Sequence, residues 1–182
     1  MNAHARTRAH TRARRSPAPR LLAAALAAAL AAGCTSPAER AIEETTPGTD
    51  VDVERGGDRI TIEDDDGSAT IDIGGELPDR IAAAFAVPAD YVVDVTSEVT
   101  QDDLTLVSVG GHLERTDLRS LAEEITDAVT AAGWTIEMTS GMGEEVQLIA
   151  ASRGDDDLQV SMTATPGSSR FDVVITLSVD GP

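Results

Sequence analysis

The chain has 182 residues and is strongly acidic, with 32 Asp and Glu residues against 14 arginines, no lysine and a net charge of −18 at pH 7. A chain this acidic repels a phosphate backbone, which excludes nucleic-acid binding from the functions we expect. Its single cysteine permits no internal disulfide, and the lack of lysine excludes catalysis through a Schiff base or a Ser–Lys pair.

The first 33 residues are typical of a secretory signal peptide. Six arginines precede an apolar run of twelve residues, Leu21 to Ala32, and no acidic residue occurs before Cys34. A membrane-spanning helix needs about twenty apolar residues, so this run is too short to be one. A basic start, a short apolar stretch and small residues at its end predict that the chain is exported and that residues 1–33 are removed.

Small residues, Ala31, Ala32 and Gly33, directly precede Cys34, and the polar stretch Thr-Ser-Pro follows it. This arrangement resembles the lipobox of bacterial lipoproteins, in which a diacylglyceryl group alkylates the cysteine thiol and a dedicated peptidase cuts just before that cysteine. Ala31 stands where the family usually has leucine. The resemblance implies lipidation of Cys34 and an extracytoplasmic protein anchored to the cell membrane. The alternative is ordinary secretory cleavage, which would leave Cys34 as a free thiol.

Removal of residues 1–33 leaves eight arginines against 32 acids, a net charge of −24. Such a surface also repels anionic lipid headgroups, so we expect membrane attachment through the lipid on Cys34 rather than through the folded part. Residues 34–49 are polar and show no regular period, which predicts a flexible tether behind the lipidated cysteine. The remaining 50–179 have the length of a single domain.

Residues 50–75 predict an antiparallel β-meander. Apolar residues alternate with acids and threonines in three short runs, and connectors rich in Gly and Asp separate the runs. One face of this meander is expected to carry the alternating apolar residues Val51, Val53, Ile60, Ile62, Ile71 and Ile73.

Residues 76–90 hold a short apolar stretch between two prolines, which fits either one or two helical turns or an irregular crossing segment. Two alternating runs follow, at 91–99 and 104–114, and the turn-forming sequence TQDD between them predicts a hairpin. Gly110 and Gly111 are expected to mark a β-bulge in the second strand of this hairpin.

The clearest helix is predicted at 117–132, with Thr116 or Asp117 as its N-cap and Gly133 as its C-terminal cap. Four strand-like runs follow, opened by Trp134 and separated by turns rich in Gly, Ser and Asp, and they form a second, terminal meander within 134–179. The helix is expected to bury one apolar stripe, formed at spacings of three and four by Leu118, Leu121, Ile125, Ala128, Val129 and Ala132.

These elements predict the α+β class: an antiparallel sheet or meander with one main amphipathic helix packed on one face. The run DGSATIDIG before ELPDRIAAAFAVP, the helix that ends in AAGW and the terminal meander also resemble a loosely defined group of small, uncharacterised bacterial lipoproteins. No activity is established for that group, so the resemblance implies a fold rather than a function.

Few residues are candidates for a catalytic or ligand-binding site. His112 is the only histidine after residue 33, so a multi-histidine zinc site is excluded, and no G-x-S-x-G motif offers a nucleophile for a catalytic triad. We expect His112 to be a surface or edge histidine. Trp134 is expected to anchor the core where the helix meets the sheet; the alternative is an exposed ligand platform.

Two acidic runs suggest sites but fit turns better. In EDDDG, 63–67, alignment of Gly67 with the invariant glycine of an EF-hand loop puts isoleucines at two positions that need oxygen ligands. The run RGDDD, 153–157, contains Arg-Gly-Asp, the tripeptide that some adhesion receptors bind. In a chain so rich in these residues, we expect the match to be due to chance. We therefore expect two solvated turns, no metal site and no cofactor.

The sequence predicts no enzymatic activity. It predicts a lipid-anchored protein of the cell envelope, in which the folded part binds another envelope protein or serves in envelope assembly. The alternative is an extracytoplasmic lipoprotein that binds a small ligand or a cation. A ligand-binding protein should contain a pocket with convergent polar groups, whereas a partner-binding protein should show an exposed apolar patch or an open sheet edge.

Overall fold

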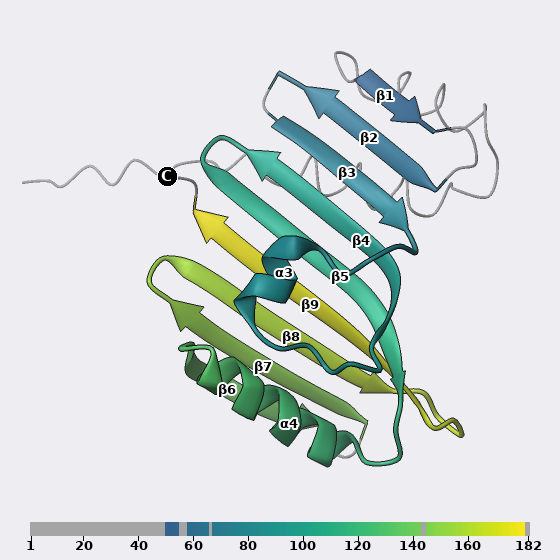
Figure 1. The fold of residues 1–182 in the computed structure, drawn as a ribbon, viewed down its shortest axis with the longest axis vertical. Coiled ribbons are helices and arrows are strands. Elements are labelled where there is room, and N and C mark those ends of the chain that lie inside the picture. Colours follow the sequence, from purple (N-terminus) through teal and green to yellow (C-terminus); the bar gives the residue numbers. More distant parts are fainter. Residues whose placement is uncertain (1–49, 55–57, 66, 143–144, 181–182) are drawn as a thin grey trace, which may run out of the picture.

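A computed structural model describes residues 50–54, 58–65, 67–142 and 145–180. Residues 1–49, which hold the predicted signal peptide, Cys34 and the predicted tether, lie outside this part of the chain. Within it, nine strands form one antiparallel sheet in the order β1-β2-β3-β4-β5-β9-β8-β7-β6, accompanied by two helices (Figure 1). The architecture is therefore a single large sheet with few helices, broadly α+β or mainly β. In the described ranges, no helix is both long and apolar enough to cross a membrane.

The N-terminal meander is confirmed. It consists of β1 (Asp50–Val53), β2 (Arg59–Asp64) and β3 (Gly67–Ile73), and each strand pairs antiparallel with the next. The predicted hairpin is β4 (Val92–Gln101) and β5 (Leu104–Glu114). The segment between the two prolines contains a short helix, α3 (Asp79–Ala84).

The main helix, α4, spans Leu118–Ala131, and the side chain of Asp117 caps it by accepting hydrogen bonds from the backbone N–H groups of Arg119 and Ser120. Gly133 follows with a φ of +85°, the left-handed conformation expected of a C-terminal cap. The terminal strands are β6 (Thr135–Met142), β7 (Val146–Arg153), β8 (Asp156–Ala164) and β9 (Arg170–Asp180).

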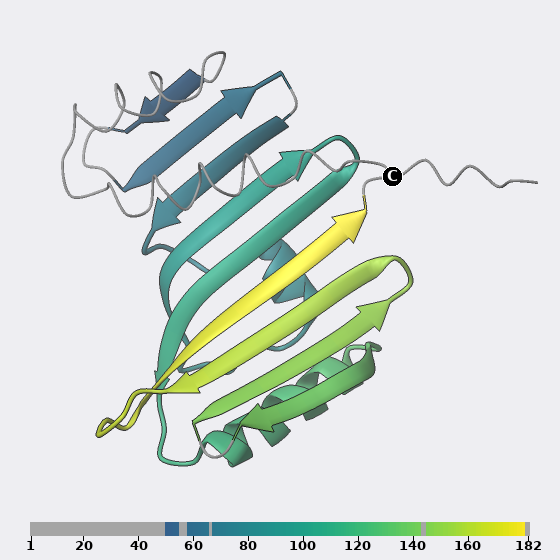
Figure 2. The same ribbon diagram turned by 180° about the vertical axis from the view of Figure 1, so that it is seen from behind.

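The last strand lies in the middle of the sheet. β9 pairs with β5 on one side and with β8 on the other, so it joins the N-terminal half to the terminal meander. Both helices cover the same face of the sheet, α3 beside β9 and α4 over β6, β7 and β8 (Figures 1 and 2). We call this the helix face, and the other side of the sheet the opposite face.

The main core lies between the helices and the helix face. The buried stripe of α4 is Leu118, Leu121, Ile125 and Val129, and Ala128 and Ala132 pack beside it. Strands β5, β7, β8 and β9 supply most of the other buried side chains of this cluster, which holds twenty described residues. The prediction of an amphipathic helix against an antiparallel sheet is confirmed for this half of the molecule.

A second apolar cluster lies on the opposite face. Its five buried members are Val51, Ile60, Ile62, Ala69 and Ile71, and the described residues that pack against it are Val53 and Val99. Paired residues point to the same side of a sheet and successive residues alternate. Ala69 pairs with Val99, which pairs with Leu106, the neighbour of the core residue Val107, so the two clusters are on different faces.

The bulge expected at Gly110 and Gly111 lies instead on the partner strand. The register of β4 against β5 shifts between Val93 and Val95, so the extra residue is Asp94. Gly111 has a different role: a Cβ atom there would come within 2.6 Å of the Tyr91 ring and 2.2 Å of the Val92 carbonyl oxygen. The glycine therefore lets Tyr91 lie directly over the strand.

Candidate functional site

The structure places Trp134 in the core, as predicted. The side chain is 3% exposed, and its indole N–H donates a 2.8 Å hydrogen bond to the carbonyl oxygen of Ala84 in α3. The guanidinium of Arg153 lies over the indole ring, 4.4 Å from its centroid. Trp134 thus ties α3 to the end of α4, and its surroundings are those of a packing residue.

Both acidic runs lie in hairpin turns. The carboxylate of Asp64 accepts a 2.9 Å hydrogen bond from the backbone N–H of Gly67 at the turn between β2 and β3, and Asp66 lies outside the described residues. At the turn between β7 and β8, Arg153 stacks on Trp134 and reaches Asp156 at 3.9 Å. Among the described residues, no group of three or more His, Cys, Asp or Glu side chains is arranged to hold a metal ion.

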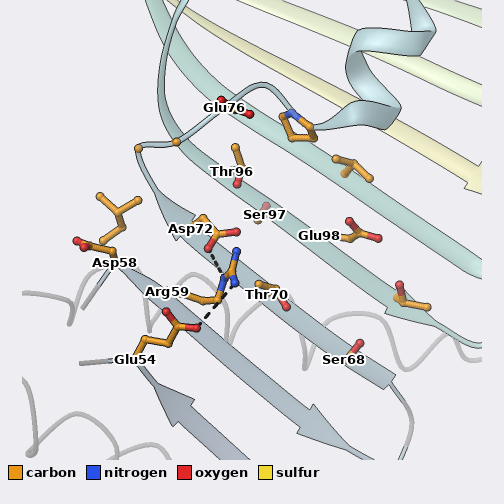
Figure 3. A pocket seen from close by; sticks show the side chains of 16 residues that line it. Glu54, Asp58, Arg59, Ser68, Thr70, Asp72, Glu76, Thr96, Ser97 and Glu98 are labelled. Atoms are coloured by element: carbon orange, nitrogen blue, oxygen red, sulfur yellow. Dashed lines mark hydrogen bonds and ion pairs between the residues drawn. The ribbon is translucent and has the colours of Figure 1, made fainter. Parts of the chain in front are cut away.

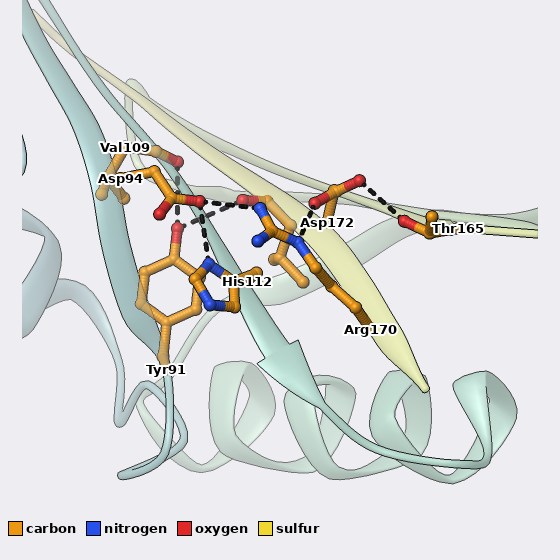
Figure 4. Close-up of polar contacts among 8 residues, drawn as sticks. Tyr91, Asp94, Val109, His112, Thr165, Arg170 and Asp172 are labelled. Atoms are coloured by element: carbon orange, nitrogen blue, oxygen red, sulfur yellow. Dashed lines mark hydrogen bonds and ion pairs between the residues drawn. The ribbon is translucent and has the colours of Figure 1, made fainter. Parts of the chain in front are cut away.

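His112 belongs to a charged cluster on the opposite face (Figure 4). Its Nδ1 lies 2.9 Å from an Asp94 carboxylate oxygen, and Arg170 donates to the same oxygen at 3.1 Å. Arg170 also donates a 3.0 Å hydrogen bond to Asp172, which lowers the pKa of that carboxyl. Because β5 is a central strand, His112 is a surface histidine but not an edge one. Its one hydrogen-bond partner in the described part of the chain is Asp94, so no nucleophile completes a triad.

Tyr91 supports this cluster from the helix face. Its hydroxyl bonds to the carbonyl oxygens of Val173, at 3.1 Å, and Val109, at 3.3 Å. Burial raises the pKa of the Tyr91 phenol, and the nearby charge of Asp94 raises it further. The phenol therefore stays protonated at neutral pH and serves as a hydrogen-bond donor to the backbone.

Beside the charged cluster, the opposite face carries an exposed apolar row. Ile73 pairs with Val95, Val95 with Gly110 and Gly110 with Val174, so the three apolar side chains form one line across β3, β4, β5 and β9. Ile73 and Val174 are each 46% exposed, and Val95 is 36% exposed. Adjacent apolar side chains with this much exposure are typical of an interaction surface. We call Ile73, Val95 and Val174 the apolar row.

A polar groove lies on the helix face of the N-terminal half (Figure 3). It has a volume of about 640 Å³ and runs over β2, β3 and β4 to the segment that leads into α3. Its floor is rich in hydroxyl groups, and the described residues of its walls carry five carboxylates and one guanidinium. The hydroxyls come from Ser68, Thr70, Thr96 and Thr100, the carboxylates from Glu54, Asp58, Asp72, Glu76 and Glu98, and the guanidinium from Arg59.

The sequence indicated this groove only in part. The alternation in β1–β3 shows acids and threonines on one side, but it does not show that β4 adds Thr96 and Glu98 to the same surface. The charged cluster gave no signal at all, because Asp94 and Arg170 are 76 positions apart in the chain.

The predicted lipidation site, Cys34, lies outside the described residues, so the geometry bears only on the folded part. Comparison of the chain with models of protein families, with curated proteins and with solved structures gave no match.

Proposed function

We propose that this chain is a lipid-anchored protein of the cell envelope, held at the extracytoplasmic side of the membrane by Cys34, and that the opposite face of its sheet binds another protein. The basic, apolar and small residues of 1–33 and the single cysteine behind them support the anchor. The apolar row supports the binding role, and it is the observation that carries this part of the proposal. No catalytic role is assigned.

The composition of the opposite face indicates what kind of partner would fit. The apolar row lies next to Asp94 and Asp172, two carboxylates that share the single guanidinium of Arg170, and the domain as a whole is strongly acidic. A partner with an apolar patch bordered by arginine or lysine would complement both features. An anionic membrane surface would be repelled, which favours a protein as the partner.

The edges of the sheet are less suited to partner binding than its face. β1 is a four-residue edge strand that carries Asp50 and Asp52, and β6 has a register shift between Ile136 and Met138. Short, charged and bulged edge strands resist the addition of a further strand. Docking on the face is therefore the mode that the geometry supports.

Photo-crosslinking in intact cells tests the binding face. A photoreactive residue at Val174 or Val95 should give a discrete adduct with one protein, whereas the same residue at Asp127, exposed on α4, should give none. Loss of the Val174 adduct on introducing Ile73→Ser would show that the row acts as one surface. Equal adducts from Asp127, or none from either row position, would contradict the proposal.

The anchor has a separate test. Cys34→Ser should abolish incorporation of labelled lipid and block cleavage before residue 34, because the thiol that accepts the lipid is gone. A variant that is still cut and still partitions into detergent would show that the anchor is assigned wrongly.

A further inference from the structure

We propose that the polar groove on the helix face is a binding site for a small organic cation with two or more ammonium groups, a compound of the linear polyamine class. The apolar row lies on the other face of the sheet, and among the described residues the two sites share only Ile73, at the end of β3. The inference is independent of the proposed function, since it needs neither the anchor nor the protein partner.

Thr96 is the residue that points most directly to a ligand. It lies in β4 and lines the groove, yet only 8% of it is exposed. Its hydroxyl has no hydrogen-bond partner among the described residues. Every described side-chain oxygen or nitrogen that is fully shut off from solvent does have a partner, so the Thr96 oxygen is not fully shut off. The Thr96 oxygen is therefore reached from the groove, and a bound donor would satisfy it at no cost to existing bonds.

The charges of the groove select a cation. Of the described residues that line the groove, only Arg59 is basic, and it is already bonded to Asp72 at 2.5 Å and lies 3.8 Å from Glu54. Asp58 and Glu76 have no ion pair within the described residues. Glu98 lies 3.9 Å from Arg80 of α3. Counted over the described residues, five carboxylates face these two guanidinium groups, so the groove keeps an excess of negative charge.

The arrangement of the carboxylates favours an extended cation over a metal ion. Asp58 and Asp72 lie on the β2–β3 side, whereas Glu98 comes from β4 and Glu76 from the segment before α3. In Figure 3, Asp72 and Glu76 lie on either side of Thr96. Across the described residues, no three such groups converge on one point as metal ligands must. Separated carboxylates suit separated ammonium groups.

The hydroxyl floor adds hydrogen bonding along the length of such a ligand. Ser68 and Thr100 are cross-strand partners on β3 and β4, as are Thr70 and Glu98, and Asp72 and Thr96. Each pair offers oxygen acceptors on the same side of the sheet. The groove volume of about 640 Å³ falls within the range of small-molecule sites.

Calorimetric titration of the purified full chain with spermidine tests the inference. Saturable binding with one site per chain is expected, weakened by added salt because the attraction is electrostatic. Thr96→Val keeps the side-chain shape and removes the hydroxyl, and it should weaken binding about tenfold, as expected for a bond to a charged donor. Its melting temperature without ligand should match that of the unaltered chain.

Three controls keep the result specific. Thr96→Ser, which retains the hydroxyl, should bind nearly as well as the unaltered chain, and it also serves if Thr96→Val does not fold. Glu98→Gln should weaken binding severalfold, whereas Glu114→Gln, which removes the same charge outside the groove, should leave it unchanged. Butylamine, with one ammonium group like a lysine side chain of a protein, should bind much more weakly. Equal affinity of all variants, equal affinity of butylamine, or no saturable binding would overturn the inference.

Discussion

The strands on the two sides of β4 use the same alternation of apolar and polar residues but turn their apolar side chains to opposite faces of one sheet. From β5 onward the buried residues face α3 and α4, whereas in β1, β2 and β3 they lie on the opposite face. The exchange takes place across β4, where Thr96 faces the helix side and Val99 the other. One continuous sheet thus has a core on each face.

This exchange explains where the candidate sites lie. On the helix face, the apolar floor under α4 gives way to hydroxyls and carboxylates under the segment before α3, which forms the polar groove. On the opposite face, the apolar cluster of β1–β3 continues into the apolar row. Each candidate site begins at the boundary where one core ends.

The largest expected effect is in the main core, at Trp134. Trp134→Ala should lower the free energy of unfolding by about 3–5 kcal/mol, because it removes a ring that is 3% exposed and its hydrogen bond to Ala84. Trp134→Phe keeps most of the ring volume and should cost about 1–2 kcal/mol. Urea denaturation measures both; a loss below about 1 kcal/mol for the alanine variant would show that the residue does not hold the core.

Matched isoleucine truncations compare the two cores directly. Ile175→Ala should cost about 4 kcal/mol, because Ile175 lies among twenty buried residues of sheet and helix. Ile62→Ala should cost about 2 kcal/mol, near the low end for such changes, since its cluster has five buried members. Both residues are at most 1% exposed, so exposure does not explain the difference. Equal costs in denaturation would show that the smaller cluster is packed as tightly as the main core.

A smaller effect is expected where α4 ends. Gly133 has a φ of +85° and nothing lies within 4 Å of where its Cβ would be, so Gly133→Ala introduces backbone strain without a clash. We expect a cost of about 1 kcal/mol in thermal or chemical unfolding. Gly133→Asn should cost less, because asparagine tolerates the left-handed conformation. An alanine variant as stable as the parent would mean that the cap is dispensable.

The smallest effect is electrostatic and concerns how stability depends on pH in acid. Arg115 donates two 2.7 Å hydrogen bonds to Asp90, which hold the pKa of that carboxyl below its ordinary value of 3.8. A lowered folded-state pKa means that the stabilisation is present above about pH 4 and is lost as the pH falls through the folded-state value. Asp90→Asn should therefore make the unfolding free energy fall less steeply below pH 4. If the unfolding free energy of the Asp90→Asn variant falls as steeply below pH 4 as that of the unaltered chain, the pair contributes nothing.

Local patterns in the sequence predicted the elements well but not their arrangement. Alternation located the strands, the spacing of Leu118, Leu121, Ile125 and Val129 located α4, and Asp117 and Gly133 marked its ends. These signals depend on neighbours in the chain. The place of β9 between β5 and β8 depends on pairing between distant segments, as do the contact of Asp94 with Arg170 and the addition of Thr96 to the polar groove.

The exchange of faces could not be predicted for a related reason. Alternation shows that one side of a strand is apolar, but it does not show to which face of the finished sheet that side turns. The register through β4 and β5 turns Ile71 and Ile175 to different faces of the sheet, so only the assembled sheet reveals this difference.

Cysteine accessibility in intact cells tests the central claim most directly: that the opposite face is occupied by a partner outside the cytoplasm. Val174→Cys and Asp127→Cys each place a thiol at an exposed position, the first in the apolar row and the second on α4. In the purified protein, a membrane-impermeant maleimide should label both rapidly. In intact cells the account predicts rapid labelling at 127 and protection at 174. Labelling at 174 as fast in cells as in the purified protein, or no labelling at either position in cells, would contradict it.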